Sequence, residues 1–117
     1  MNKIFFLLTV FGLFLTDLTF AQSEAETAEM FKLKCGICHT IGGGRLVGPD
    51  LANVHERRSE EWLLEYIRSS QTMIKNGDPD AVALFEEYNQ VIMPDPMISD
   101  TEIKSILGYI AANSAGG

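Results

Sequence analysis

Cys35-Gly36-Ile37-Cys38-His39 is the stretch that decides the fold, and it contains both cysteines of the 117-residue chain. The pattern Cys-x-x-Cys-His is typical of covalent haem attachment. Each thiol can add to one vinyl group of a haem, and the adjacent imidazole can bind the iron. The stretch therefore predicts a fold that wraps around one haem c, attached through Cys35 and Cys38, with His39 as an iron ligand.

Two other uses of the cysteines stay open on these residues alone. A Cys-x-x-Cys pair can be a thioredoxin-like redox dithiol. It can also be half of a zinc site, with His39 or His55 as further ligands. The dithiol lacks the expected βαβ pattern and leaves His39 without a role, and the zinc site lacks a second ligand pair at a usable spacing. The haem interpretation is favoured over both.

The first 21 residues have the features of a secretory signal peptide that is cleaved off. Lys3 supplies the positive charge, residues 4–15 are apolar, and Thr19-Phe20-Ala21 places small residues at the cleavage site. The apolar run is shorter than the roughly 20 residues of a membrane span. We therefore expect a protein that is periplasmic or otherwise exported, without a stable membrane anchor. The alternative is a membrane tether formed by the uncleaved segment.

The remaining residues, 22–117, are enough for one small domain, whose core a large apolar cofactor would enlarge. The formal net charge of the chain is −7. Such an acidic protein is a poor candidate for binding nucleic acid, which prefers basic surfaces. It suits redox protein partners with a basic docking patch, although acidity also serves solubility. We expect a monomer.

Apolar periodicity and loops rich in glycine and proline predict an all-α fold of about four helices around the haem. The first helix is expected at 23–34, with the haem motif at its C-terminal end. The second begins after the cap Ser59. The third has Asp78 as its cap, begins at Pro79 and runs to about residue 89. Ser99-Asp100-Thr101-Glu102 is a capping box that opens the last helix. The apolar stripes of the second and last helices are Trp62, Leu63, Tyr66 and Ile67, and Ile103, Ile106, Leu107 and Ile110.

A methionine is the expected second iron ligand, because a thioether helps to raise the reduction potential of an electron carrier. Met93 is the best placed, since Pro94 stiffens the loop that leads into the last helix. Met97, in the same loop, is the next candidate. Met30 lies too close to the haem motif to reach the other face of the haem. Met73 lies at a helix end, where methionine commonly fills a core.

Together these features resemble the class I c-type cytochromes, a family with one haem per chain. The resemblance covers nearly the whole chain after the signal segment. It rests on the haem motif, on Gly48-Pro49-Asp50-Leu51, on Trp62-Leu63, on Met93-Pro94 and on the closing helix. It implies that the Pro49 carbonyl accepts a hydrogen bond from His39 and so fixes the plane of the imidazole.

The resemblance also implies that Phe31 and Tyr109 pack the first and last helices together. The family often has a glycine eight residues before the first cysteine, where these helices cross closely. That position is Thr27 here. The crossing is therefore expected to be wider, or to be relieved by Ala28 and Gly108.

Arg45, Trp62 and Tyr66 are candidate ligands of the haem propionates, because a guanidinium, an indole N–H and a phenol can all donate hydrogen bonds. Arg45 could equally be solvated in its glycine-rich loop, and the two aromatic residues could be plain core. His55 lies in a charged stretch and is interpreted as exposed rather than as a ligand.

The leading function hypothesis is a periplasmic electron carrier, not an enzyme, that serves a respiratory chain by one-electron transfer through a His39/Met93-ligated haem. The alternative is an enzyme or sensor whose sixth iron position is open to nitric oxide, carbon monoxide or peroxide. That alternative needs a distal acid/base group or a mobile ligand, and no spare histidine has a suitable setting. A redox dithiol without haem is the third hypothesis.

Overall fold

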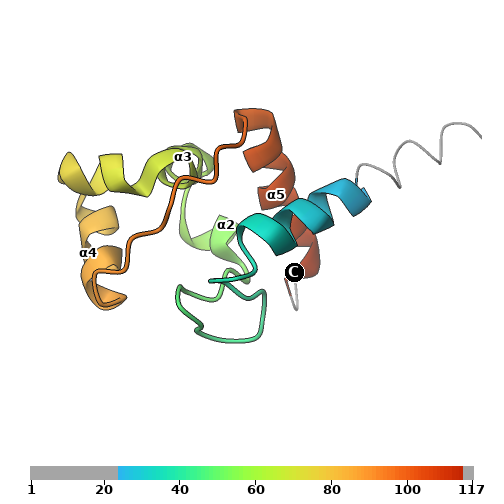
Figure 1. Ribbon diagram of the computed structural model, residues 1–117, viewed down its shortest axis with the longest axis horizontal. Coiled ribbons are helices and arrows are strands. Elements are labelled where there is room, and N and C mark those ends of the chain that lie inside the picture. Colours follow the sequence, from blue (N-terminus) through green and yellow to red (C-terminus); the bar gives the residue numbers. More distant parts are fainter. Residues whose placement is uncertain (1–23, 115–117) are drawn as a thin grey trace, which may run out of the picture.

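The computed structural model describes residues 24–114, which form helices and loops without a strand (Figure 1). A helix over residues 24–34 leads into the haem motif, which forms a turn. It is followed by α2 (Val54–Arg57), α3 (Glu60–Lys75), α4 (Pro79–Glu87) and α5 (Asp100–Asn113). The predicted all-α fold is confirmed. The short α2 was not predicted, because four residues are too few to show a helical period.

None of the helices in this described range is long and apolar enough to cross a membrane. The predicted signal peptide, residues 1–21, lies outside the range.

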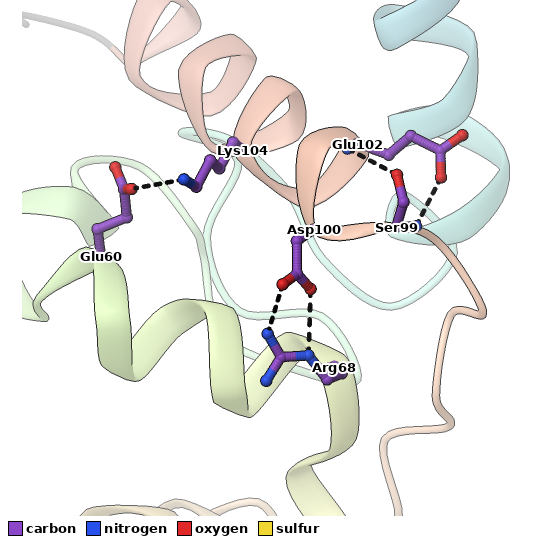
Figure 2. A network of polar contacts seen from close by, with 6 residues as sticks. All are labelled: Glu60, Arg68, Ser99, Asp100, Glu102 and Lys104. Atoms are coloured by element: carbon purple, nitrogen blue, oxygen red, sulfur yellow. Dashed lines mark hydrogen bonds and ion pairs between the residues drawn. The ribbon is translucent and has the colours of Figure 1, made fainter.

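The helix starts predicted from capping residues are confirmed. The side chains of Ser59 and Asp78 each accept a hydrogen bond from the backbone N–H three residues further on, at 3.2 and 2.9 Å. At the start of α5, Ser99 Oγ accepts from the Glu102 N–H at 3.2 Å, and Glu102 accepts from the Ser99 N–H at 2.7 Å (Figure 2). These bonds satisfy N–H groups that a helix start otherwise leaves unpaired.

The core forms where α5 packs against the first helix and α3. The predicted apolar stripe of α5 is buried, with each of its four side chains at most 8% exposed. The rings of Phe31 and Tyr109 lie 5.5 Å apart between centroids, so the expected aromatic contact between the first and last helices is confirmed. A methyl group on Gly108 would meet nothing within 4 Å, and this glycine therefore marks no close approach.

Two ion pairs join α3 to α5 on the surface (Figure 2). Arg68 donates to both carboxylate oxygens of Asp100, at 3.1 and 2.8 Å. Lys104 lies 3.9 Å from Glu60. Exposed pairs stabilise a protein by only about 0–1 kcal/mol. The bidentate pair of Arg68 with Asp100 nevertheless has a geometric role, because it fixes the first residue of α5 against α3.

The middle helix, α3, is kinked at Ser69, whose φ of −161° and ψ of 91° are not helical. The next residue, Ser70, is only 2% exposed. The irregular segment 91–99, drawn in orange in Figure 1, runs across α3 from the end of α4 to the start of α5. This segment carries Met93.

Candidate functional site

A cavity of about 800 Å³ lies between the segment after the first helix, α3, the end of α4 and the segment 91–96. Its size falls within the roughly 300–1,000 Å³ of ligand pockets. The eight residues that the sequence analysis favours for the site all line this cavity, although they are scattered along the chain. They are Cys35, Cys38, His39, Arg45, Pro49, Trp62, Tyr66 and Met93. Apolar side chains such as Leu63, Ile67, Ile106 and Ile110 line much of the remainder.

Of the four methionines in the described range, Met93 is the one that lines the cavity. Met73 is buried elsewhere, at 8% exposure. Met30 packs against the core cluster. Met97 is 86% exposed. The structure therefore separates Met93 from the other candidate ligands.

The two cysteines lie in the turn that follows the first helix. The backbone N–H groups of Cys38 and His39 both donate to the Cys35 carbonyl, at 3.1 and 3.0 Å. Burial raises the pKa of the Cys35 thiol to about 11. Redox dithiols work through thiolates with a lowered pKa, so this environment does not favour the dithiol interpretation. Among residues 24–114, no three His, Cys, Asp or Glu side chains gather as a metal site of their own.

His39 is held from two sides. Its Nδ1 lies 2.9 Å from the Pro49 carbonyl oxygen, which is the hydrogen bond that the resemblance implies. Because a carbonyl only accepts, Nδ1 carries the proton in this bond, and the lone pair of Nε2 stays free for a metal. Gly48 packs against the ring: a Cβ there would lie 2.5 Å from His39 Cε1. The sequence analysis did not predict this role of Gly48, although the Gly48-Pro49 pair could have indicated that a side chain packs closely against the backbone there.

Trp62 and Tyr66 are stacked, with ring centroids 4.7 Å apart and planes 13° from parallel. The Trp62 indole N–H donates to Asp78 at 3.2 Å, so this donor is directed to the cap of α4. Within residues 24–114, the Tyr66 hydroxyl has no hydrogen-bond partner, and burial raises the pKa of Tyr66. Of this pair, Tyr66 is the residue whose donor is available to a ligand in the cavity.

Arg45 spans from the glycine-rich loop to the end of α4. Its guanidinium donates to the Glu87 carbonyl at 3.0 Å and lies 4.0 Å above the ring of Tyr88. It is therefore not merely solvated in its loop, and four of its five N–H donors stay free of that bond. Three further cations line the cavity that sequence reasoning did not nominate: Lys34, Arg57 and Arg58.

Comparison with known proteins agrees with this geometry. A model of the cytochrome c family matches residues 24–114. The chain belongs to the cytochrome c family. Members of this family are haem-based electron carriers, and they bind haem c covalently.

Solved structures of other cytochromes c share the fold. A cytochrome c from Rhodothermus marinus is 25% identical, with a TM-score of 0.71 over 83% of this chain and 81% of that one. The cytochrome c domain of a Pseudomonas putida protein is 31% identical, with a TM-score of 0.63 over 72% and 83% of the two chains. No curated protein sequence matches this cytochrome.

The residues of the cytochrome fit haem c. Two thiols, an imidazole with one free nitrogen and a thioether border one largely apolar cavity, and these are the donor groups by which proteins hold a covalent haem. The thiols of Cys35 and Cys38 would hold the ring edge, and His39 and Met93 would hold the iron.

Asp50, whose role was not foreseen, supports the histidine side of this cytochrome's site. Its carboxylate accepts hydrogen bonds from the backbone N–H groups of Gly42, Gly44 and Ala52, at 2.8, 2.8 and 2.9 Å. These bonds, that of Ala52 foremost, lower the pKa of Asp50. Gly42 and Gly44 have φ of 85° and 87°, a conformation that favours glycine. Asp50 directly follows Pro49, so its carboxylate holds the glycine-rich loop next to the residue that binds His39.

Proposed function

We propose that this cytochrome is an exported one-electron carrier of a respiratory chain. In this proposal haem c is attached through Cys35 and Cys38, and His39 and Met93 are the axial ligands of its iron. The observation that supports the proposal best is that these four side chains line one cavity. The bound haem would supply the one-electron redox chemistry, because a thioether and an imidazole together suit an electron-transfer iron.

The way the chain holds the two ligands supports electron transfer rather than catalysis. The Pro49 carbonyl and the backbone of Gly48 hold the ring of His39 in one orientation. Pro94 follows Met93 directly and restricts its backbone to extended conformations. A site with two protein ligands held in this way would leave no position at the iron for a substrate. It would also change little in geometry when an electron arrives or leaves.

The partners of the carrier would be redox proteins that dock at the mouth of the cavity. Val47, Val91 and Ile92 line the cavity and are 47%, 50% and 58% exposed, so they offer apolar contact to a partner. Redox encounters use small interfaces that part quickly. The net charge of −7 supports a partner with a basic patch. Electron-transfer rates with such a partner should fall as salt is added, and rates independent of ionic strength would contradict this steering.

Covalent haem and its ligation are tested together on the purified protein. We expect a pyridine haemochrome spectrum of haem c, and in the ferric protein the weak red absorption band of a thioether–iron bond. Met93→Ala should remove this band and open the reduced protein to carbon monoxide. Met97→Ala is the matched control, because the Met97 side chain is 86% exposed and does not line the cavity. If Met93→Ala keeps the band and excludes carbon monoxide, Met93 is not the ligand.

Export is tested by the N-terminus of the protein recovered from the producing cell. We expect a periplasmic form that begins at Gln22. A membrane-bound form that still carries residues 1–21 would instead support the tether.

A further inference from the structure

The segment that carries Met93 has very few hydrogen bonds. Both of its ends are held: the Val91 N–H donates to the Tyr88 carbonyl at 3.3 Å, and the Ser99 N–H donates to Glu102 at 2.7 Å. Between them, residues 92–98 make one hydrogen bond to the rest of the described chain, which the Ser70 hydroxyl donates to the Met93 carbonyl at 3.3 Å. The backbone position of Met93 therefore depends on packing and on this one bond.

Ser70 is an unusual residue for its place in the cavity wall. Its neighbours on the same face of α3, including Leu63, Ile67 and Ile74, are apolar and also line the cavity. Ser70 is only 2% exposed, and burying a hydroxyl is unfavourable unless it makes a hydrogen bond. An alanine would fill the same place without that requirement. The hydroxyl therefore points to a specific use, and the Met93 carbonyl is its one partner.

The kink of α3 connects this bond to the end of the segment. Ser69, at the kink, separates Ser70 from Arg68. Arg68 binds both carboxylate oxygens of Asp100, the first residue of α5 (Figure 2). Residues on the two sides of one kink thus hold the segment at Met93 and just beyond its end.

We propose that Ser70 is a positioning residue for Met93: its hydroxyl fixes the Met93 backbone so that the thioether stays at the sixth position of the haem iron. This inference rests on the proposed ligation by Met93. Ser70 itself does not touch the iron or the sulfur in this scheme, and it acts only through the Met93 carbonyl.

The expected effect is modest and measurable. A hydrogen bond of this kind contributes about 0.5–1 kcal/mol, which corresponds to a roughly two- to five-fold change in an equilibrium. At 3.3 Å the bond is long for a hydroxyl donor, which favours the lower part of that range. Losing it should raise the population of haem without a bound thioether by this factor. The rate at which carbon monoxide binds to the reduced protein should rise by the same factor, because carbon monoxide enters when the thioether leaves.

The test uses four variants of the holoprotein. Ser70→Ala and Ser70→Val remove the hydroxyl, and Ser70→Thr keeps it. Threonine and valine have nearly the same shape, so any cost of the extra methyl group is shared and their difference reports the hydrogen bond. Ser105→Ala is the matched control, because the exposed Ser105 also donates from a helix to a backbone carbonyl, that of Thr101 at 3.1 Å. The measurements are carbon monoxide binding, the red band and backbone NMR order parameters of the Ile92, Asp95 and Met97 amides.

We expect faster carbon monoxide binding, a weaker red band and lower order parameters in Ser70→Ala, and in Ser70→Val relative to Ser70→Thr. Ser105→Ala should behave as the wild type. The inference is overturned if Ser70→Ala matches the wild type, or if Ser70→Thr and Ser70→Val behave alike. If valine and threonine prevent haem attachment, the comparison of Ser70→Ala with Ser105→Ala decides alone. A wild-type protein without the red band would contradict Met93 ligation itself, and the Ser70 inference would fall with it.

Discussion

Replacing Gly48 by alanine tests how the histidine is held. A Cβ at this position would lie 2.5, 2.8 and 3.2 Å from Cε1, Nδ1 and Nε2 of His39. Gly48 is not among the glycines with positive φ, so alanine brings no backbone strain and the effect is one of space. Ordinary van der Waals contact begins near 3.4 Å, and the ring must therefore move by roughly 1 Å. Such a shift breaks the 2.9 Å hydrogen bond to the Pro49 carbonyl.

The magnitude follows from two contributions. Overpacking costs about 1–3 kcal/mol and the lost hydrogen bond about 1 kcal/mol, so Gly48→Ala should lower the free energy of unfolding by about 2–4 kcal/mol. At about 4–8 °C per kcal/mol for a domain of this size, Tm should fall by about 10 °C or more. Thermal unfolding of the holoprotein, followed by circular dichroism, measures this fall.

Gly108→Ala is the control for this experiment. A Cβ there meets nothing within 4 Å, and alanine is favoured over glycine in a helix by about 1 kcal/mol, so this variant should be as stable as the wild type or slightly more stable. Both substitutions reduce the freedom of the unfolded chain alike. A Gly48→Ala protein with the Tm of the wild type would refute the close contact between Gly48 and the imidazole.

Four further substitutions test other parts of the structure. The pKa of Asp50 is lowered in the folded state, so its contribution to stability is present above the usual pKa of about 4 and is lost as pH falls through the lowered value. Asp50→Asn should therefore be less stable at neutral pH and lose less stability on acidification, as urea denaturation at several pH values would show. Phe31→Ala should cost about 3–5 kcal/mol in the same assay, because the ring is buried against α5, whereas Tyr109→Phe keeps the ring contact and should cost little. Trp62→Phe should lower the free energy of unfolding by about 1 kcal/mol, because the hydrogen bond to Asp78 is lost, and should leave the reduction potential unchanged. A shifted potential in a redox titration would indicate instead that the indole binds a haem propionate.

The parts of this cytochrome that the sequence predicted correctly depend on neighbours along the chain. The caps at Ser59, Asp78 and Ser99 each join groups three residues apart, so their chemistry can be read locally. The haem motif likewise packs its three reactive groups into five residues. The apolar period of the last helix predicted which of its faces is buried.

Other features depend on contacts between segments far apart in the sequence, and a local sequence pattern does not predict such contacts. From the sequence, the Trp62 indole could donate to a haem propionate or to an acidic side chain. In the structure Asp78 lies close enough to accept this hydrogen bond. Arg45 in its glycine-rich loop gains its hydrogen bond to the Glu87 carbonyl only because the two segments meet beside the cavity. The bond from Ser70 to Met93 exists because a kink in α3 meets an irregular segment that passes over it.

The motif Cys35-Gly36-Ile37-Cys38-His39 could be recognised along the chain because covalent attachment needs reactive groups at fixed, short spacings. A methionine ligand could also be expected, but residues 24–114 contain four methionines that could fill this role. Their different surroundings became visible only when the chain folded. Met93 borders the cavity and Met97 points largely to solvent, because a side chain's burial is set by the segments that pack against it in space.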